Sequence, residues 1–409
     1  MHRPTTGAGR AHPYHRVRAL DPLDLSARDV QAWVALEARA AEPNAFLSPH
    51  FILPALRHLD PQIKPMALFV ERVFAGQREL LGVAVLRRTA GTRSFPLSHW
   101  IAYASRHSYL SGLLVDQERP DEVIETVLHH LDRKGGHNGL ELPRVELDGR
   151  VGRALAESVL VGHGVDAGIG ERRAVLHPAS AGPALVKQVF GKRAKDLERR
   201  MRRLREQGEV NWRCHRGAGM PAAVVEDFLA LEHAGWKGSE GTSLRANAPD
   251  ERFFREMVAG FAEEQRAVFT EVVLDGRAIA SACHFLSGGA GFCFKIGWDP
   301  QYRAFSPGIL NEVEFIRHAP EVFADVGFFD SGASEDSFIN ELWPERRTLG
   351  TITLTTAPLA RWVAQTASSA HRLRRQWQTS PLHPLSWHAS KPEWITVASE
   401  SLSTFPIVL

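Results

Sequence analysis

Hydrophobic residues alternate with small or polar ones over three consecutive stretches in the second half of the chain. Residues 267–274 and 277–286 flank Asp275 and Gly276, a residue pair that is typical of the tight turn of a β-hairpin. A glycine-rich turn then leads to residues 292–299, which alternate again. The pattern predicts a three-stranded antiparallel meander.

The last strand of this meander carries bulky side chains at every second position. Because successive side chains of a strand point to opposite faces, four of them are expected together. They are Phe292, Phe294, Ile296 and Trp298. Cys293 and Lys295 are then expected on the opposite face of the sheet.

A helix and another strand are predicted directly after the meander. The helix covers 306–319 and the strand 325–330. A strand, a crossing helix and a second strand usually place the two strands parallel and in one sheet. Ligands of such sheets bind at the carboxyl ends of the strands, so we expect Ser306 and Asp330 to border a crevice there.

The first half of the chain shows similar kinds of element in a similar order. It is expected to hold helices at 27–40, 120–136 and 151–164 and strands at 67–73, 79–88, 142–149 and 172–178. The sequence therefore predicts an α/β protein with two domains in tandem, each with a mixed twisted sheet flanked by helices. A structure with one continuous sheet through both halves would contradict two separate domains.

We expect four segments along the 409 residues. They are a flexible basic tail at 1–18, an N-terminal domain at 19–180, a C-terminal domain at 181–377 and a poorly ordered tail at 378–409. A linker rich in Pro, Ala and Ser at 178–184 marks the expected boundary.

The composition is that of an ordinary globular protein, with 44% hydrophobic and 23% charged residues. The net charge of +2 gives no reason to expect nucleic acid or an anionic membrane as a partner. Three cysteines without a CxxC pair, no secretory signal and no membrane span indicate a cytoplasmic protein. No metal-ligand spacing is apparent, and the oligomeric state is left open.

Residues 191–208 form a strongly basic helix in this prediction. Its apolar residues are spaced by three and four and make one narrow stripe: Ala194, Leu197, Met201 and Leu204. Such a helix offers a basic surface for phosphates, or it is a solvated face of a packed helix. We expect an exposed scaffold helix and not a main nucleic-acid surface.

The start of the 306–319 helix is chemically unusual. Ser306 suits an N-cap and Pro307 suits the first helical position, but Gly308 lowers helix propensity by roughly 1 kcal/mol relative to Ala. A bare helix N-terminus is a ready anion site, so these residues are candidates for binding a phosphate or carboxylate. The alternative is a well-capped helix without a ligand.

The meander followed by "WDPQYRAFSPG" resembles the acyl-CoA-binding core of the GNAT acyltransferase superfamily. More narrowly, it is similar to CelD-type acetyltransferases associated with cellulose biosynthesis. Two further stretches agree with that resemblance, "LEHAGWKGSEGTSL" at 231–244 and "FDSGASEDSFINELWPERR" at 329–347. The resemblance covers about 190 to 356, and related Fem-type aminoacyltransferases place two GNAT-like domains in tandem.

The resemblance implies an acyl-CoA-dependent N- or O-acetyltransferase with acetyl-CoA, or another acyl-CoA, as co-substrate and a small-molecule or saccharide acceptor. A link to exopolysaccharide or cell-envelope synthesis is also implied. Cofactor binding is expected at Arg303, Ser306, Pro307 and Gly308. Substrate binding is expected at Glu232, Trp236, Lys237 and His284. His284 is otherwise a core histidine.

Asp330 and Glu335 are the candidate catalytic bases, and Asp330 is the better placed. The chain departs from its relatives at Phe338 and Ile339, where many of them have Tyr-Lys, so the Tyr that protonates the leaving thiolate is not available there. Two alternatives stay open: a Fem-type aminoacyltransferase that uses charged tRNA, and a GNAT-like scaffold with a degenerate site.

Overall fold

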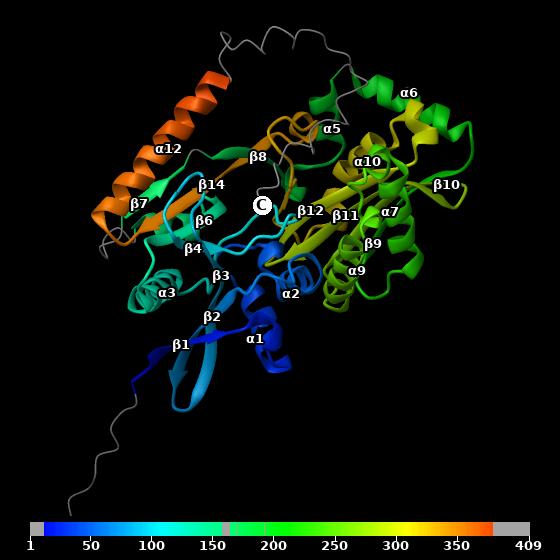
Figure 1. Ribbon diagram of the computed structural model, residues 1–409. Helices are drawn as coiled ribbons and strands as arrows, with labels where there is room; N and C mark the ends of the chain where they lie inside the picture. The colour runs from blue at the N-terminus through cyan, green and yellow to red at the C-terminus, as the bar shows by residue number, and fades with distance from the viewer. Residues whose placement is uncertain (1–11, 158–163, 169, 192, 379–409) are drawn as a thin grey trace, which may run out of the picture.

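The computed structural model describes residues 12–157, 164–168, 170–191 and 193–378. It confirms the α/β class, with a large mixed sheet flanked by helices (Figure 1). The strands are β1 (Tyr14–Leu20), β2 (Met66–Phe74), β3 (Gln77–Thr89), β4 (His99–Ala102), β5 (Leu114–Val115), β6 (Gly139–Glu146), β7 (Gly164–Ala167), β8 (Glu171–Leu176), β9 (Val210–Arg216), β10 (Ala267–Leu274), β11 (Arg277–Ser287), β12 (Ala290–Trp298), β13 (Phe328–Asp330) and β14 (Glu345–Thr355).

The helices lie on both sides of the sheet. They are α1 (Ala27–Glu37), α2 (Pro49–Pro54), α3 (Pro120–Lys134), α4 (Arg150–Glu157), α5 (Pro183–Phe190), α6 (Arg193–Arg205), α7 (Ala222–Ala234), α8 (Trp236–Ser239), α9 (Ala248–Glu263), α10 (Pro307–Val322), α11 (Ile339–Leu342) and α12 (Pro358–Gln378). In the described part of the chain, no helix is long and apolar enough to cross a membrane.

The strands of both halves belong to one continuous sheet. Its order is β1-β2-β3-β4-β6-β14-β8-β13-β12-β11-β10-β9, with β5 and β7 paired at its side. The expectation of a separate sheet in each half is therefore wrong. The cause is β14, which follows the whole second half in sequence but pairs with β6 and β8 of the first half.

The meander and the parallel pair are confirmed. β10, β11 and β12 are antiparallel neighbours, and β12 runs parallel to β13. The turn between β10 and β11 has positive φ at both Asp275 (48°) and Gly276 (82°), as a tight primed turn requires. Helix α10 connects β12 to β13, so the predicted strand-helix-strand unit is present.

A bulge in β12 changes which side chains share a face. Cys293 pairs with His284 and Lys295 pairs with Cys283, so Phe294 is the extra residue between two register positions. Phe292 and Phe294 belong to one core cluster, whereas Cys293 and Trp298 pack against the cluster on the other face. The expected alternation of four bulky residues onto one face is therefore wrong beyond Phe294.

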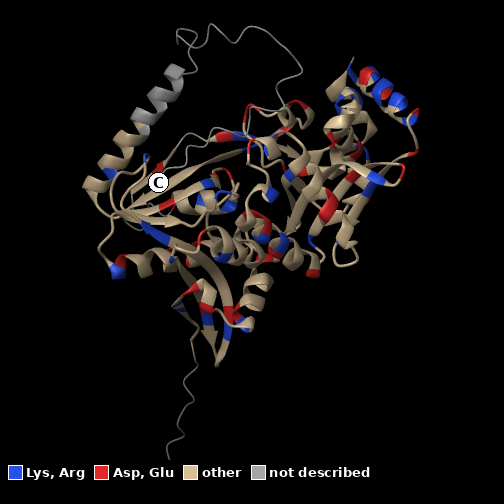
Figure 2. Ribbon diagram, turned by 45° about the vertical axis from the view of Figure 1, so that its right-hand side comes forward, with Lys and Arg blue, Asp and Glu red and all other residues tan. Residues whose placement is uncertain are grey.

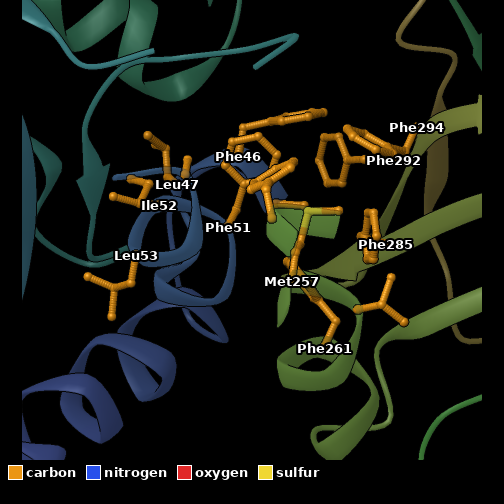
Figure 3. Close-up of a cluster of buried hydrophobic side chains, with 14 of the residues drawn as sticks. Phe46, Leu47, Phe51, Ile52, Leu53, Met257, Phe261, Phe285, Phe292 and Phe294 are labelled. Carbon is orange, nitrogen blue, oxygen red and sulfur yellow. The ribbon is translucent and has the colours of Figure 1, made fainter. Parts of the chain in front are cut away.

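One apolar core joins the two halves. Figure 3 shows this core, with Phe46 and Phe51 from the first half of the chain and Phe292 and Phe294 from β12. Phe46 and Phe292 meet edge to face at 6.1 Å between ring centroids, and Phe51 meets Phe253 of α9 at 5.3 Å. This shared core explains why the halves pack as one body despite their separate sequence patterns.

Three local expectations need correction or lie outside the description. The expected basic tail reaches only to the start of β1, because Tyr14–Leu20 pairs with β2 as an edge strand. The acidic stretch 334–343 also has the pattern of a helix, but it contains only the single turn of α11. The expected tail at 378–409 falls almost entirely outside the described residues.

The basic helix has the expected narrow buried stripe. In α6, Leu197, Met201 and Leu204 are buried, and Asp196 pairs with Arg200 at 2.8 Å. Figure 2 shows basic and acidic residues intermixed along this helix. The helix is thus a packed element with a charged outer face.

Candidate functional site

Inside the sheet, the carboxyl-terminal part of β12 is left unpaired on one side. β12 pairs with β13 only from Ala290 to Phe292, opposite Phe328 to Asp330. Within the described residues, no strand pairs with 293–298 on this side, because β13 ends while β12 continues. Two parallel strands that separate in this way leave a wedge, and the bulge at Phe294 lies at its inner end.

Two side chains reach the backbone carbonyls along this open edge. The Tyr109 hydroxyl donates to the Phe294 carbonyl at 2.9 Å, and the Lys237 ammonium donates to the Ile296 carbonyl at 3.3 Å. Tyr109 comes from the first half of the chain and Lys237 from the second. The edge of β12 is therefore a place where both halves contribute polar groups.

Lys237 lies in an environment that disfavours its charge. The residue is only 8% exposed. Burial and, less strongly, the nearby Lys295 lower its pKa to about 8, although Glu232 acts in the opposite direction. At neutral pH an appreciable fraction of Lys237 is consequently in the free amine form.

Glu232 is the carboxylate partner of Lys237. Its Oε1 lies 3.6 Å from the Lys237 ammonium, and its Oε2 accepts a hydrogen bond from the Leu244 amide at 2.8 Å. The carbonyl of Lys237 accepts from the amides of Thr242 and Ser243, which fixes the loop after α8. The predicted substrate-binding residues Glu232 and Lys237 therefore lie together at the β12 edge.

Trp236 was predicted beside these residues. Its backbone begins α8, next to Lys237. Its side chain lies outside what the structure describes. Its proposed contact with a substrate remains a prediction.

The start of α10 follows the open edge in sequence. Ser306 has φ 54° and ψ 57°, a left-handed conformation, and its side chain makes no cap hydrogen bond. Its Oγ accepts instead from the Arg200 guanidinium of α6. Ser306 thus occupies the expected N-cap position but does not cap the helix with its side chain, and a basic side chain lies at this helix start. Arg303 lies on the preceding 3₁₀ turn (Pro300–Phe305) and is exposed.

Close packing explains why residue 308 is a glycine, which the sequence context did not indicate. It is buried, and a Cβ placed on it would lie 3.3 Å from Trp298 and 3.4 Å from Ile296. The missing side chain therefore lets α10 approach β12 closely. Close packing is thus a sufficient reason for a glycine at this position, without a bound anion. The backbone N–H groups of this turn remain candidates for binding an anion.

Asp330 lies at the end of β13 as predicted, but in a fully buried ion-pair cluster. Its Oδ1 is 3.7 Å from Arg173 of β8, and its Oδ2 is 3.5 Å from Arg347 of β14. The Gly332 amide donates to Oδ1 at 2.7 Å. The carboxylate thus connects three neighbouring strands from both halves of the chain.

Glu335 and His284 have partners other than Lys237 and Tyr109. Glu335 is exposed and accepts a hydrogen bond from the Arg172 amide at 2.7 Å. His284 is 3% exposed, stacks on Phe315 at 5.1 Å and lies 3.1 Å from the Cys293 sulfur. Burial lowers its pKa to about 3, so it is a neutral core histidine, the alternative that the sequence analysis kept.

The loop after β4 contributes groups that sequence reasoning missed. His107 stacks on Phe253 at 5.5 Å and its Nε2 lies 2.6 Å from an Asp250 carboxylate oxygen, which Arg106 also contacts. Burial lowers the pKa of His107 to about 4, so the ring is neutral at pH 7. The only available signal was the polar run "SRHSY". A loop has no periodic hydrophobic pattern, so its contact with the other half of the chain could not be predicted.

The site contains ammonium, imidazole, carboxylate and hydroxyl groups. Within the described residues, no group of three or more His, Cys, Asp and Glu side chains could hold a metal ion. Cys214, Cys283 and Cys293 are free thiols. The chemistry that these groups offer is proton transfer and hydrogen bonding beside an open strand edge.

Comparison with known proteins agrees with this geometry. Residues 191–338 match the family model of the acetyltransferase (GNAT) domain. That segment contains β12, α10, Glu232 and Lys237. None of the curated proteins matches the chain.

Solved structures extend the likeness to both halves. FemX aligns with a TM-score of 0.54 at 11% identity, over 85% of this chain and 100% of FemX. The C-terminal domain of a protein described as a lysylphosphatidylglycerol synthetase from Agrobacterium fabrum aligns with a TM-score of 0.50 at 14% identity, over 86% of this chain and 96% of that domain. At these identities the likeness establishes a shared fold.

Proposed function

We propose that the protein is an acyl-CoA-dependent N- or O-acyltransferase, with acetyl-CoA as the expected donor. The observation that carries the proposal is the bulged, unpaired edge of β12 beside the start of α10. An extended amide-containing chain can add to such an edge by main-chain hydrogen bonds, as a peptide strand does. The match of residues 191–338 to the GNAT domain supports the assignment.

The pantetheine arm of the donor would lie along residues 293–298 in this proposal. Its thioester would then reach the bulge at Phe294, near Lys237. The phosphates would lie at the start of α10, where Arg200 contacts Ser306 and Arg303 is exposed. Arg303, Ser306, Pro307 and Gly308 keep their expected role in cofactor binding on this basis.

Lys237 is the candidate general base that would deprotonate the acceptor. A general base works best when its pKa is near the working pH, and that of Lys237 is about 8. The neutral amine would take the proton of the attacking amine or hydroxyl, which forms its bond to the acyl carbon while the carbon–sulfur bond breaks. Tyr109, whose hydroxyl contacts the bulge residue Phe294, would give a proton to the thiolate.

Asp330 has a structural role in this proposal. A fully buried carboxylate between two arginines cannot approach a substrate proton without breaking the strand contacts around it. Glu335 remains a weaker candidate because it is exposed and lies on the loop after β13. The cellulose-related acceptor that the CelD-type resemblance suggests also remains part of the proposal.

Isothermal titration calorimetry with acetyl-CoA, with CoA as the comparison, tests the donor. We expect acetyl-CoA to bind with a Kd between about 1 µM and 1 mM, the usual range for an enzyme substrate. A Fem-type aminoacyltransferase would bind neither and would consume aminoacyl-tRNA instead. A scaffold with a degenerate site would bind CoA and acetyl-CoA equally and transfer nothing. Absence of acetyl-CoA binding contradicts the proposal.

A further inference from the structure

Helix α12 carries large apolar side chains on its outside and small ones on its inside. Leu359 and Trp362 are 71% and 63% exposed, whereas Ala360 and Ala364 are buried and pack with Phe95 in one small core cluster. A helix that merely covers a sheet shows the opposite order, with its large apolar residues turned toward the core. As far as the structure describes the chain, the outer face of α12 is therefore apolar and uncovered.

The exposed pair belongs to a longer apolar stripe in the sequence. At the helical rotation of about 100° per residue, five apolar positions of α12 fall within a sector about 100° wide. They are Leu359, Trp362, Val363, Leu373 and Trp377. A sector of this width is sufficient to bury one face of a helix against an apolar medium. The sequence thus continues the stripe that the structure exposes at the start of α12.

The same helix is strongly basic. It contains Arg361, Arg372, Arg374 and Arg375 and no Asp or Glu, and no acidic residue occurs from 346 to 392 in the sequence. The net charge of +2 for the whole chain conceals this local excess. A basic helix with an apolar stripe that contains Trp and Leu is typical of helices that lie in the interface of an anionic membrane. The charge of α12 is therefore complementary to a surface of anionic lipid.

Tryptophan is concentrated in the same part of the sequence. Four of the ten tryptophans of the chain are Trp362, Trp377, Trp387 and Trp394. Tryptophan favours the boundary between membrane and water because its ring is apolar and its N–H is polar. Figure 1 shows α12 at the outer edge of the molecule beside β7, where a flat surface can reach it.

We propose that α12 binds the surface of a bilayer that contains anionic phospholipid, with the helix lying parallel to that surface. Leu359 and Trp362 enter the interface, and the positive charge of the helix attracts it to the lipid phosphates. A second copy of the chain is a poorer occupant, because two paired α12 helices would bring their arginines together. The proposal uses no residue of the β12 edge, so it does not depend on the proposed acyl transfer.

Cosedimentation of the full-length protein with lipid vesicles tests the proposal. One set of vesicles is phosphatidylcholine alone, and the other is an equal mixture of phosphatidylcholine and phosphatidylglycerol. We expect binding to the mixed vesicles to be at least about 10-fold tighter, since each Arg near an anionic surface contributes about fivefold. The triple variant Arg372→Gln/Arg374→Gln/Arg375→Gln should remove most of that preference.

The double variant Leu359→Ala/Trp362→Ala is expected to weaken binding to the mixed vesicles about 10-fold or more, because it removes the exposed apolar side chains. Leu23→Ala/Phe74→Ala is the matched control. Leu23 and Phe74 are also exposed large hydrophobic residues, at 44% and 49%, but they lie in the first half of the chain. Circular dichroism melting verifies that each variant folds.

The proposal is overturned if the wild type binds neither kind of vesicle, or if the control variant weakens binding as much as Leu359→Ala/Trp362→Ala does. Light scattering after size exclusion tests the competing occupant. A wild-type dimer that Leu359→Ala/Trp362→Ala converts to a monomer, without vesicle binding, would assign the face to a second copy of the chain. Binding of polyglutamate but not of vesicles would assign it to an acidic protein.

Discussion

Replacing Lys237 by Met together with Glu232 by Gln is expected to lower turnover about 10²-fold or more, while the Kd for acetyl-CoA changes less than about threefold. A general base typically contributes 10²–10⁴-fold to the rate, and Met cannot accept a proton. Both charges are removed together because Lys237→Met alone would leave the buried Glu232 carboxylate without its cation, which is strongly destabilising. Steady-state rates and calorimetry on the same preparations measure the two effects.

The pH dependence of the rate gives a second measure of the same base. Since the pKa of Lys237 is lowered to about 8, the amine is charged and inactive below that pH and free above it. We therefore expect kcat to rise through about pH 8 and then level off. Glu232→Gln is the control that keeps the amine; it removes a group that raises this pKa, so its profile should shift to lower pH. A double variant with wild-type turnover would exclude Lys237 as the base.

Asp330→Asn is expected to lower the free energy of unfolding by about 3 kcal/mol, measured by urea denaturation. The substitution removes the negative charge between Arg173, which is buried, and Arg347, whose side chain is 9% exposed. The Asn side-chain oxygen can still accept the hydrogen bond from the Gly332 amide. The loss of stability therefore measures the removal of the charge and not a change in the turn. Acetyl-CoA affinity of the folded protein should be nearly unchanged.

Glu335→Gln provides the comparison for Asp330. Glu335 is exposed, and Gln can still accept the hydrogen bond from the Arg172 amide. We expect no measurable change in its urea midpoint and little change in turnover. If Asp330→Asn were stable but lost turnover selectively, Asp330 would be the base and the structural role assigned to it would be wrong.

Local pattern was sufficient for the elements that surround the site. The Asp275–Gly276 turn and the alternation on either side predicted β10 and β11, and the Ser306-Pro307-Gly308 sequence predicted where α10 begins. Glu232 and Lys237 were selected by family resemblance and lie together in the structure. These features depend on residues close in sequence, where period and turn chemistry are informative.

Features that depend on residues far apart in the chain could not be predicted from the sequence. The partner strands of β14 are decided by packing between halves, and its alternating pattern would fit the edge of many sheets. The alternating hydrophobic pattern of 292–298 does not indicate the bulge at Phe294. The bulge nevertheless moves Ile296 and Trp298 to the opposite face of the sheet from Phe294. Tyr109 reaches β12 from a loop 185 residues away in sequence.

The central claim is that an acyl thioester binds along the open edge of β12. A crystal structure with acetyl-CoA bound tests it most directly. The account predicts pantetheine beside residues 293–298, the thioester near Phe294 and Lys237, and the phosphates at the start of α10. Acetyl-CoA bound elsewhere, with the Tyr109 and Lys237 contacts to β12 unchanged, would contradict it.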